Sequence, residues 1–379
     1  MHHGRRLAAL VLASFTLAAA HAALPIPKPP SINARAMILV DYDSGRVLAE
    51  SNADERMEPA SLTKVMTAYI AFEALKEGRL KLDEEIPVSE HAWRSEGSRS
   101  FVQVGTRVPA EVLIKGMMVQ SGNDATIAVA ERLGGTEQGF AQMMNAYAQK
   151  LGMTHTHFEN STGLPGASHY TTARDMATLA RAVIHDYPEY YKWYSLREFT
   201  WNNIRQQNRN GLLGRDPSVD GIKTGHTESA GYCLATSAKR DGMRLISAVF
   251  GTSSLKARED ASAALLNYGF TFYETVKVKG RGETVLAPRL YKGAEDHVAI
   301  GPRTDVYVTI ARGNAALVKT SATAREPLLA PAVPTQAAGE LVVSVGADTV
   351  ARVPLYPVKA VAEGGWWTRM IDGIALLWR

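Results

Sequence analysis

The chain has 379 residues, of which 46% are hydrophobic and 21% are charged, and this composition excludes an intrinsically disordered, collagen-like or low-complexity protein. The net charge of +4 is too small to indicate nucleic-acid binding, and the single cysteine, Cys233, excludes both an intramolecular disulfide and a cysteine-cluster metal site. A chain of this length is expected to form about two domains.

Residues 1–22 have the pattern of a secretory signal peptide. Arg5 and Arg6 precede an apolar stretch over residues 7–20, and the small residues of Ala20-His21-Ala22 provide a cleavage site. The apolar stretch is shorter than the roughly 20 residues that a membrane-spanning helix needs, which disfavours the alternative of an uncleaved N-terminal anchor. The sequence therefore predicts that the protein is exported and that this leader is removed.

Residues 34–273 mix strand and helix patterns. Strands are predicted at residues 36–40, 46–49, 232–237 and 245–250, and helices at residues 61–75, 114–118, 125–133, 140–151, 171–184 and 257–270. The last two strands are joined by a predicted turn at Arg240-Asp241-Gly242. Because strands from both ends of the segment flank a helical centre, we predict one α+β domain over residues 34–273.

Residues 275–358 have a different residue pattern. Short apolar runs alternate there with Gly and Pro, and no long helical pattern occurs among them. This alternation predicts a small all-β domain that follows the α+β domain.

Residues 365–379 form a predicted amphipathic helix. At about 100° per residue, one face of about 140° of arc carries the apolar side chains, which are Trp366, Trp367, Met370, Ile371, Ile374, Leu377 and Trp378. Arg369 and Asp372 lie on the opposite side. The helix is too short to span a bilayer, and its tryptophan-rich face suits the membrane interface. We predict a peripheral membrane anchor; the alternative is a terminal helix that packs on its own domain.

Ser61 opens a Ser-x-x-Lys motif at the start of a predicted helix. Residues three positions apart share a helix face, so Lys64 is expected to lie beside the Ser61 hydroxyl. A desolvated lysine can be neutral enough to act as the base that a serine nucleophile needs. The motif alone is weak evidence, because Ser253 and Lys256 match it as well.

Two further polar motifs follow along the chain. Ser121-Gly122-Asn123 precedes a predicted helix, where Ser and Asn are also ordinary N-cap residues. Lys223-Thr224-Gly225, continued by His226 and Thr227, precedes a predicted strand, where a lysine is ordinarily solvated. Each motif has an ordinary structural explanation when it is taken alone.

Together, in this order and spacing, the three motifs resemble those of the serine penicillin-recognising enzymes, where they converge on one cleft. With residues 160–165, 169–175 and 208–213, the chain is identified as a member of the low-molecular-mass penicillin-binding proteins. These are serine D-alanyl-D-alanine carboxypeptidases of the penicillin-binding protein 5/6 type, in peptidase family S11. The resemblance implies a β-lactamase/transpeptidase-like α+β domain, in which an antiparallel sheet packs with helices and a helical subdomain, followed by the small all-β domain.

The resemblance implies a role for each catalytic position. Ser61 matches the acylated nucleophile, and Lys64 matches its base. Ser121 matches the residue that passes a proton to the leaving amine, and Asn123 matches a residue that holds Lys64 and the substrate amide. The backbone N–H groups of Ser61 and His226 match an oxyanion hole.

The resemblance also implies substrate-binding residues. Lys223 matches a cation across the cleft, within the motif that includes Thr224, Gly225, His226 and Thr227. Arg258 matches a cation for the terminal carboxylate of the substrate, and Arg209 and Ser98 match accessory residues near the cleft. Because like charges disfavour each other, Lys223 is expected to lower the pKa of Lys64.

The implied reaction removes the terminal D-alanine from peptidoglycan pentapeptide stems through an acyl-enzyme on Ser61. The implied partners are D-Ala-D-Ala peptides, β-lactam antibiotics and the outer face of the inner membrane, which places the protein in the periplasm. No cofactor and no metal are expected, because His155 and His157 have no third ligand within a recognisable motif. Cys233 is expected to be a small buried side chain.

Two alternative enzymes use the same kind of site. A class A β-lactamase needs a Glu-x-x-Leu-Asn pattern for deacylation, and no such pattern occurs between Ser121 and Lys223. A D,D-endopeptidase or transpeptidase differs only in its substrate or acceptor, and the sequence leaves these activities open. A non-enzymatic envelope protein is disfavoured because every catalytic position is filled.

Overall fold

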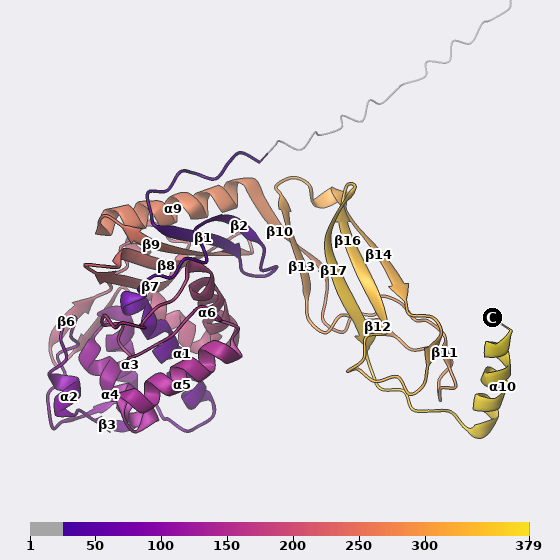
Figure 1. The fold of residues 1–379 in the computed structure, drawn as a ribbon, viewed down its shortest axis with the longest axis horizontal. Coiled ribbons are helices and arrows are strands. Elements are labelled where there is room, and N and C mark those ends of the chain that lie inside the picture. The colour runs from indigo at the N-terminus through magenta and orange to yellow at the C-terminus, as the bar shows by residue number, and fades with distance from the viewer. Residues whose placement is uncertain (1–25, 379) are drawn as a thin grey trace, which may run out of the picture.

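The computed structural model describes residues 26–378, so the predicted signal peptide lies outside the described residues. Figure 1 shows three parts in chain order. We call the elements from β1 to α9 the N-terminal domain, those from β10 to β17 the β domain, and α10 (Trp366–Leu377) the tail helix. In Figure 1 the β domain lies between the N-terminal domain and the tail helix.

An antiparallel sheet of five strands is the framework of the N-terminal domain, in the order β2-β1-β9-β8-β7. Its strands are β1 (Ala36–Asp41), β2 (Val47–Ser51), β7 (Val219–Thr227), β8 (Gly231–Arg240) and β9 (Met243–Thr252). The first strand pairs with the last, with Ile38 opposite Ala248, so the two ends of this domain meet in one sheet. Strand β7 lies at an edge of the sheet.

Helices cover both faces of the sheet (Figure 1). Helix α9 (Leu255–Phe272) packs on one face, and a larger helical layer packs on the other. Alternate residues of β8 point to opposite faces, so Leu234 lies in the core under α9 and Ala235 in the core under the helical layer. The α+β architecture expected from the sequence is confirmed.

The remaining elements of the N-terminal domain lie between β2 and β7. The helices are η1 (Ala60–Thr63), α1 (Lys64–Lys76), α2 (Glu90–Trp93), α3 (Ala110–Val119), α4 (Asn123–Gly134), α5 (Glu137–Lys150), α6 (Ala173–Asp186), α7 (Pro188–Tyr191), η2 (Lys192–Ser195) and α8 (Leu212–Arg215). The strands are the pairs β3 (Glu85–Pro87) with β4 (Arg107–Pro109), and β5 (Glu198–Trp201) with β6 (Ile204–Gln207).

Two local predictions differ from the structure. The helix predicted from Ser61 begins as the 3₁₀ turn η1 and becomes α-helical only at Lys64. The Lys223-Thr224-Gly225 motif lies inside β7 rather than ahead of a strand, because β7 extends over Val219–Thr227 to pair with β8.

The β domain contains the strands predicted for residues 275–358. Its elements are β10 (Tyr273–Lys279), β11 (Leu290–Tyr291), β12 (Ile300–Gly301), β13 (Val306–Ala311), η3 (Ala315–Leu317), β14 (Val318–Ala324), β15 (Leu328–Leu329), β16 (Gly339–Val345) and β17 (Asp348–Pro357). A four-stranded sheet, β12-β17-β16-β14, packs with the pairs β10-β13 and β11-β15 around a core that includes Val308, Leu341 and Leu355. The all-β prediction is confirmed.

The two domains meet through a short polar joint. Helix α9 ends at Phe272 and β10 begins at Tyr273, so no loop separates them. Asp41, which is fully buried in β1, accepts a hydrogen bond of 2.6 Å from the Thr275 hydroxyl of β10. Arg46 donates to the Thr309 carbonyl of β13 at 2.5 Å. These contacts connect the sheet of the N-terminal domain to the first strands of the β domain.

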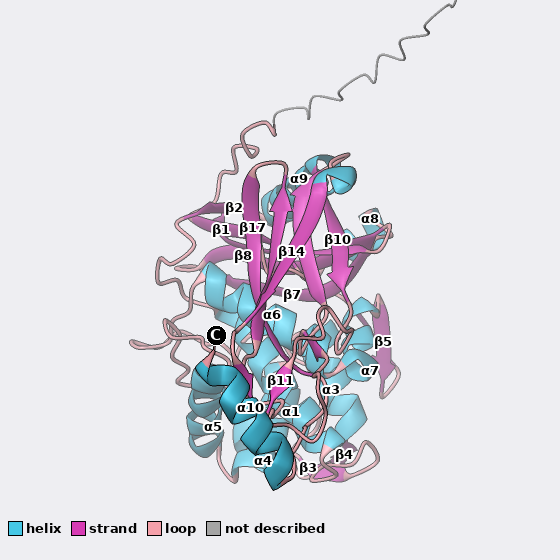
Figure 2. Ribbon diagram, turned by 90° about the vertical axis from the view of Figure 1, so that its right-hand side faces the viewer, coloured by secondary structure: helices cyan, strands magenta, loops and turns pink. Residues whose placement is uncertain are grey.

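The tail helix lies beside β11 in Figures 1 and 2. Its large apolar side chains are exposed, with Leu377 83% and Trp378 88% accessible. Within residues 26–378, no helix combines the length and the apolar composition needed to cross a bilayer. The predicted amphipathic helix is thus present, with its apolar face uncovered by the described chain.

Candidate active site

Ser61 and Lys64 are adjacent in space, as their spacing predicts. Lys64 Nζ lies 3.0 Å from Ser61 Oγ and donates a second hydrogen bond of 2.6 Å to the carbonyl of Thr162. Ser61 is partly accessible, whereas Lys64 is only 1% exposed. An accessible hydroxyl therefore has a buried amine within hydrogen-bonding distance, which is the arrangement of a nucleophile and its base.

The backbone around Ser61 is unusual. Ala60 has a φ of +46°, which is costly for a residue with a Cβ and persists only where the surroundings hold it. Gly163 packs so closely on this turn that a Cβ there would lie 1.7 Å from the Ala60 carbonyl oxygen. Gly225 of β7 approaches from the other side, where a Cβ would lie 3.1 Å from the Pro59 carbonyl oxygen. Two glycines thus allow a loop and a strand to clamp the start of the helix.

The environment of Lys64 favours its neutral form. Burial, and after it the positive charge of Arg209, lower its pKa from 10.5 to about 7. The negative charges of Glu137 and Asp124 act in the opposite direction and are smaller causes. The direction expected from the sequence is confirmed, but the causes are burial and Arg209 rather than Lys223.

A group of cations lies on the β7 side of the site. Lys223 is 2% exposed, so the alternative of a solvated edge-strand lysine is wrong. Burial and then the charge of Lys64 hold the pKa of Lys223 well below its usual range. Arg258, also 2% exposed, donates to the Gly225 carbonyl at 3.1 Å and to the Arg209 carbonyl at 3.4 Å. This positive region can attract a substrate carboxylate.

Ser121 and Asn123 contribute polar atoms without protein partners. Ser121 has a φ of +66°, and both its hydroxyl and the Asn123 side-chain oxygen are buried with no hydrogen-bond partner. The Asn123 amide nitrogen donates to the Glu96 carbonyl, and its backbone N–H donates to the Ser98 carbonyl at 2.7 Å. Asn123 begins α4 with Gly122 as the N-cap residue, so neither Ser121 nor Asn123 serves as a side-chain cap. Buried polar atoms that lack partners are suited to bind a ligand.

The other residues of the β7 motif differ in exposure. Thr224 is buried, Thr227 is partly buried, and His226 is exposed with its ring 4.0 Å from that of Tyr232. Thr227 donates at 3.3 Å to the carboxylate of Glu58, three residues before Ser61. The end of β7 is thereby linked to the segment that leads to the nucleophile.

Arg209 connects the three motifs. Its guanidinium donates to the Gln120 carbonyl at 3.0 Å, directly before Ser121, and its carbonyl accepts from Arg258, which also binds Gly225. Its charge lowers the pKa of both Lys64 and Lys223. The structure therefore brings the motifs around Ser61, Ser121 and Lys223 to one region of the N-terminal domain, while Ser98 reaches it through its carbonyl.

Some contributors were missed by sequence reasoning. The Thr162 carbonyl binds Lys64, and a backbone acceptor leaves no trace in a residue pattern. Asn160 shapes this loop by accepting from the N–H groups of Thr162 and Gly163 at 3.1 and 2.7 Å. Glu137 of α5 supports it by accepting from the Ser161 N–H at 3.0 Å. Residues 160–165 carry part of the family resemblance, but their contact with Lys64 follows only from the tertiary structure.

The histidines and the cysteine singled out in the sequence have ordinary structural contacts. In the part of the chain that the structure describes, no group of three or more His, Cys, Asp or Glu side chains is arranged to hold a metal ion. His157 instead contacts the Ser168 carbonyl and stacks on Tyr170. Cys233 is fully buried opposite Gly225, and burial raises the pKa of its thiol to about 11, so it lacks the thiolate of a reactive cysteine.

These elements together can perform acyl transfer. A hydroxyl adjoins a lysine whose pKa is close to neutral, and unpartnered polar atoms lie at a second motif. Two buried basic side chains, Lys223 and Arg258, lie at the edge strand. Nucleophile, base and charge stabilisation are the three components that such a reaction needs.

Comparisons with known proteins agree with this chemistry. The family described as D-alanyl-D-alanine carboxypeptidase matches residues 24–254, and the C-terminal domain of penicillin-binding protein 5 matches residues 273–363. D-alanyl-D-alanine carboxypeptidase DacC of Escherichia coli strain K12 is 42% identical over 365 residues, which cover 94% of this chain and 91% of the relative.

Solved structures of penicillin-binding proteins are also similar to this chain. Penicillin-binding protein 5 from Haemophilus influenzae has a TM-score of 0.85 and 39% identity, and the match covers 89% of this chain and 100% of that chain. Penicillin-binding protein D2 from Listeria monocytogenes, in its ampicillin-bound form, has a TM-score of 0.56 and 32% identity. That match covers 63% of this chain and 98% of the Listeria chain.

Proposed function

This chain belongs to the D-alanyl-D-alanine carboxypeptidase family of serine peptidases, and we propose that Ser61 is the nucleophile through which it releases the terminal D-alanine of peptidoglycan pentapeptides. The observation that carries this assignment is the 3.0 Å contact between Ser61 Oγ and the buried Lys64 Nζ. The three-residue spacing occurs twice in the sequence, but Lys256 of the second copy is 80% exposed and paired with Asp260.

Acylation begins when Ser61 Oγ attacks the carbonyl carbon of the penultimate D-alanine. Lys64 takes the hydroxyl proton, which requires its neutral form. The backbone N–H groups of Ser61 and His226 stabilise the resulting oxyanion. Ser121 delivers a proton to the leaving amine as the amide C–N bond breaks, and free D-alanine departs.

The substrate is held by the groups on either side of Ser61. Lys223 and Arg258 provide positive charge for the terminal carboxylate, and Thr224 and Thr227 provide hydroxyl donors. The unpartnered Asn123 oxygen can accept from a substrate amide. Gly225 allows β7 to approach the nucleophile, and Arg209 and Ser98 complete the wall of the site.

Deacylation completes the cycle. Water attacks the acyl-enzyme ester, Ser61 leaves with a proton, and the tetrapeptide is released. A β-lactam follows the same first step, because its strained amide is attacked by Ser61 to give a penicilloyl ester. The assignment therefore predicts that this chain binds penicillin covalently.

The test is mass spectrometry of the protein after incubation with a pentapeptide or with penicillin. We expect loss of one D-alanine from the peptide and a penicilloyl adduct on Ser61, both abolished in Ser61→Ala and both retained in the matched control Ser253→Ala. An adduct on another residue would contradict the assignment. Rapid release of hydrolysed penicillin would indicate a β-lactamase, and cleavage of cross-linked dimers would indicate an endopeptidase.

We also propose a location for the enzyme. Residues 1–22 act as a signal peptide, residues 34–273 are the catalytic domain, residues 275–358 are the β domain, and residues 365–379 anchor it at the outer face of the inner membrane. The exposed apolar face of the tail helix supports this proposal. Flotation with lipid vesicles tests it: a chain that ends at Glu363 should lose the binding that the longer chain shows, and unchanged binding would contradict the anchor.

A further inference from the structure

Asp372 is a buried carboxylate on the otherwise exposed tail helix. It is 5% exposed, whereas Trp366, Ile371 and Ile374 on the same helix are more than half exposed. At 100° per residue, Asp372 lies about 170° from the centre of the apolar face. An acidic side chain is seldom buried without partners, so the back of this helix is held by specific contacts.

Two groups of the β domain bind this carboxylate. The Arg289 guanidinium donates to Asp372 Oδ1 at 2.9 Å, and the backbone N–H of Lys292 donates to Asp372 Oδ2. Charge-assisted hydrogen bonds of this kind are stronger than neutral ones. They join the middle of the tail helix to the segment around β11, with Arg289 directly before this strand and Lys292 directly after it.

The chain that enters the helix is packed against the same segment. Gly364 N–H donates to the Lys292 carbonyl at 2.8 Å, and Glu363 forms a β-bridge with Gly293. A Cβ at Gly364 would lie 2.5 Å from the Gly293 carbonyl oxygen, so this approach is possible only for glycine. At the next position, Gly365, a Cβ would meet nothing within 4 Å.

We propose that Asp372 is a positioning residue that locks the tail helix on the β domain, so that its apolar face meets the bilayer at a fixed angle. We call this set of contacts, made by Arg289, Lys292, Gly293, Gly364 and Asp372, the clasp. The inference rests on the proposed membrane anchoring. With the loop-free joint at Phe272 and Tyr273, the clasp connects the described elements from the tail helix to the active site without a flexible linker.

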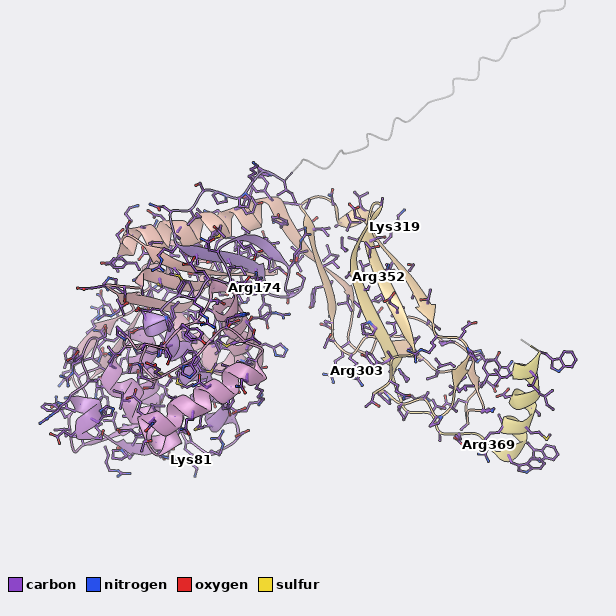
Figure 3. All side chains as sticks on the ribbon, in the orientation of Figure 1. Lys81, Arg174, Arg303, Lys319, Arg352 and Arg369 are labelled. Carbon is purple, nitrogen blue, oxygen red and sulfur yellow. The ribbon has the colours of Figure 1, made fainter. Side chains whose placement is uncertain are left out.

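The arrangement in space agrees with this role. In Figure 3, Arg369 marks the tail helix at one end of the molecule, and Lys81 lies in the N-terminal domain, on the far side of the β domain. The active site is therefore separated from the lipid by the length of the β domain. A helix on a flexible tether would let the active site sample many distances from the membrane surface, whereas a clasped helix holds it at one distance. Substrates displayed at that distance then have a higher effective concentration at the active site.

Spin-label distances test the clasp directly. The label pair is made by Lys319→Cys on β14 and Ala375→Cys on the tail helix, both at exposed positions, and the buried Cys233 stays unlabelled. We expect one narrow distribution of label-to-label distances when the clasp is intact. The width of this distribution should increase at least twofold in Asp372→Ala and in Gly364→Ala. Gly365→Ala is the matched control and should keep the narrow distribution. A narrow distribution in both clasp variants would overturn the proposal.

Kinetics on vesicles of phosphatidylethanolamine and phosphatidylglycerol give a second measurement. For a pentapeptide attached to lipid, both clasp variants should raise KM several-fold and leave kcat unchanged, while kinetics with a soluble pentapeptide stay as in wild type. An unchanged KM for the attached peptide would overturn the proposal. Vesicle flotation separates the clasp hypothesis from the anchoring hypothesis. The clasp variants should still float with the vesicles, whereas failure of the wild-type protein to float would contradict membrane anchoring itself.

Discussion

Lys64 shows how its surroundings can prepare an ordinary residue for the role of the base that we propose. Its spacing from Ser61 is shared by Lys256 and Ser253, but Lys256 is exposed at the start of α9 and pairs with Asp260. Lys64 is enclosed and donates to the Thr162 carbonyl. Burial disfavours the charged ammonium and is the main reason why the pKa of Lys64 falls to about 7.

The pH dependence of acylation follows from this pKa. Because neutral Lys64 is the active form and its pKa is about 7, the rate should fall about tenfold per pH unit below 7 and level off above it. In Arg209→Gln the loss of a neighbouring positive charge should raise the pKa of Lys64 and move this acidic limb to higher pH, by up to about one pH unit. Stopped-flow acylation with a fluorescent penicillin measures both profiles.

Arg205→Gln is the control for this experiment. Arg205 is an exposed arginine on β6 that pairs with Glu198, and Lys64 is not among the groups it perturbs. Its profile should match wild type. An acidic limb that stays in place or moves to lower pH in Arg209→Gln would show that Arg209 does not set the charge state of the base.

Among the elements, the loop at residues 160–163 contacts Lys64 directly. Asn160 holds its backbone, Glu137 holds Ser161, and the Thr162 carbonyl receives the Lys64 hydrogen bond. The loop reaches this position because Gly163, with a φ of +89°, presses on the Ala60 carbonyl. Strand β7 completes the clamp from the opposite side through Gly225.

Gly163→Ala should therefore damage activity more than stability alone explains. The new Cβ must displace the loop from Ala60, which moves the acceptor of Lys64, and we expect acylation to fall about 100-fold, as for other misplacements of about 1 Å. Gly152→Ala is the matched control, because Gly152 also has a positive φ of +77° but open space around it.

The control variant should lose about 1 kcal/mol of unfolding free energy from backbone strain and keep its acylation rate. Urea unfolding and fluorescent-penicillin labelling measure the two quantities on both variants. Equal acylation rates in Gly163→Ala and Gly152→Ala would show that the loop does not position the base.

At the scale of the whole molecule, the groups that we assign to catalysis belong to one domain. Every residue assigned to the site lies before β10, and the sheet that supports them closes when β1 pairs with β9. The Listeria relative matches almost its entire length to 63% of this chain. The β domain and the tail helix thus extend a unit that contains the complete site.

A chain truncated after Phe272 should therefore remain active. We expect its acylation rate to stay within about threefold of the full chain, since no site residue is removed. Its unfolding free energy should fall by about 1–3 kcal/mol, because the joint hydrogen bonds of Asp41 and Arg46 are lost. Labelling with fluorescent penicillin and urea unfolding check both values, and an inactive but folded fragment would contradict the prediction.

The sequence alone determined what depends on short spacing and on composition. A spacing of three positions on a helix places Lys64 beside Ser61. The alternation of short apolar runs with Gly and Pro predicts the all-β domain, and the period of 3.6 residues predicts the amphipathic tail helix. The motif order was sufficient to predict the family, because each residue in it must have a particular chemical group. These properties are local, so they can be seen before the chain folds.

Only the tertiary structure decided which of these groups are buried and what they contact. The acceptor of Lys64 lies 98 residues away at Thr162, the strongest neighbouring charge comes from Arg209, and Asp372 finds Arg289 across 83 residues. The burial of a side chain and the electrostatic potential at it depend on atoms from residues that are distant in the chain, so neither can be read from a local pattern. Spacing places Ser61 beside Lys64, but the packing of loop, strand and helix around them buries Lys64 and lowers its pKa.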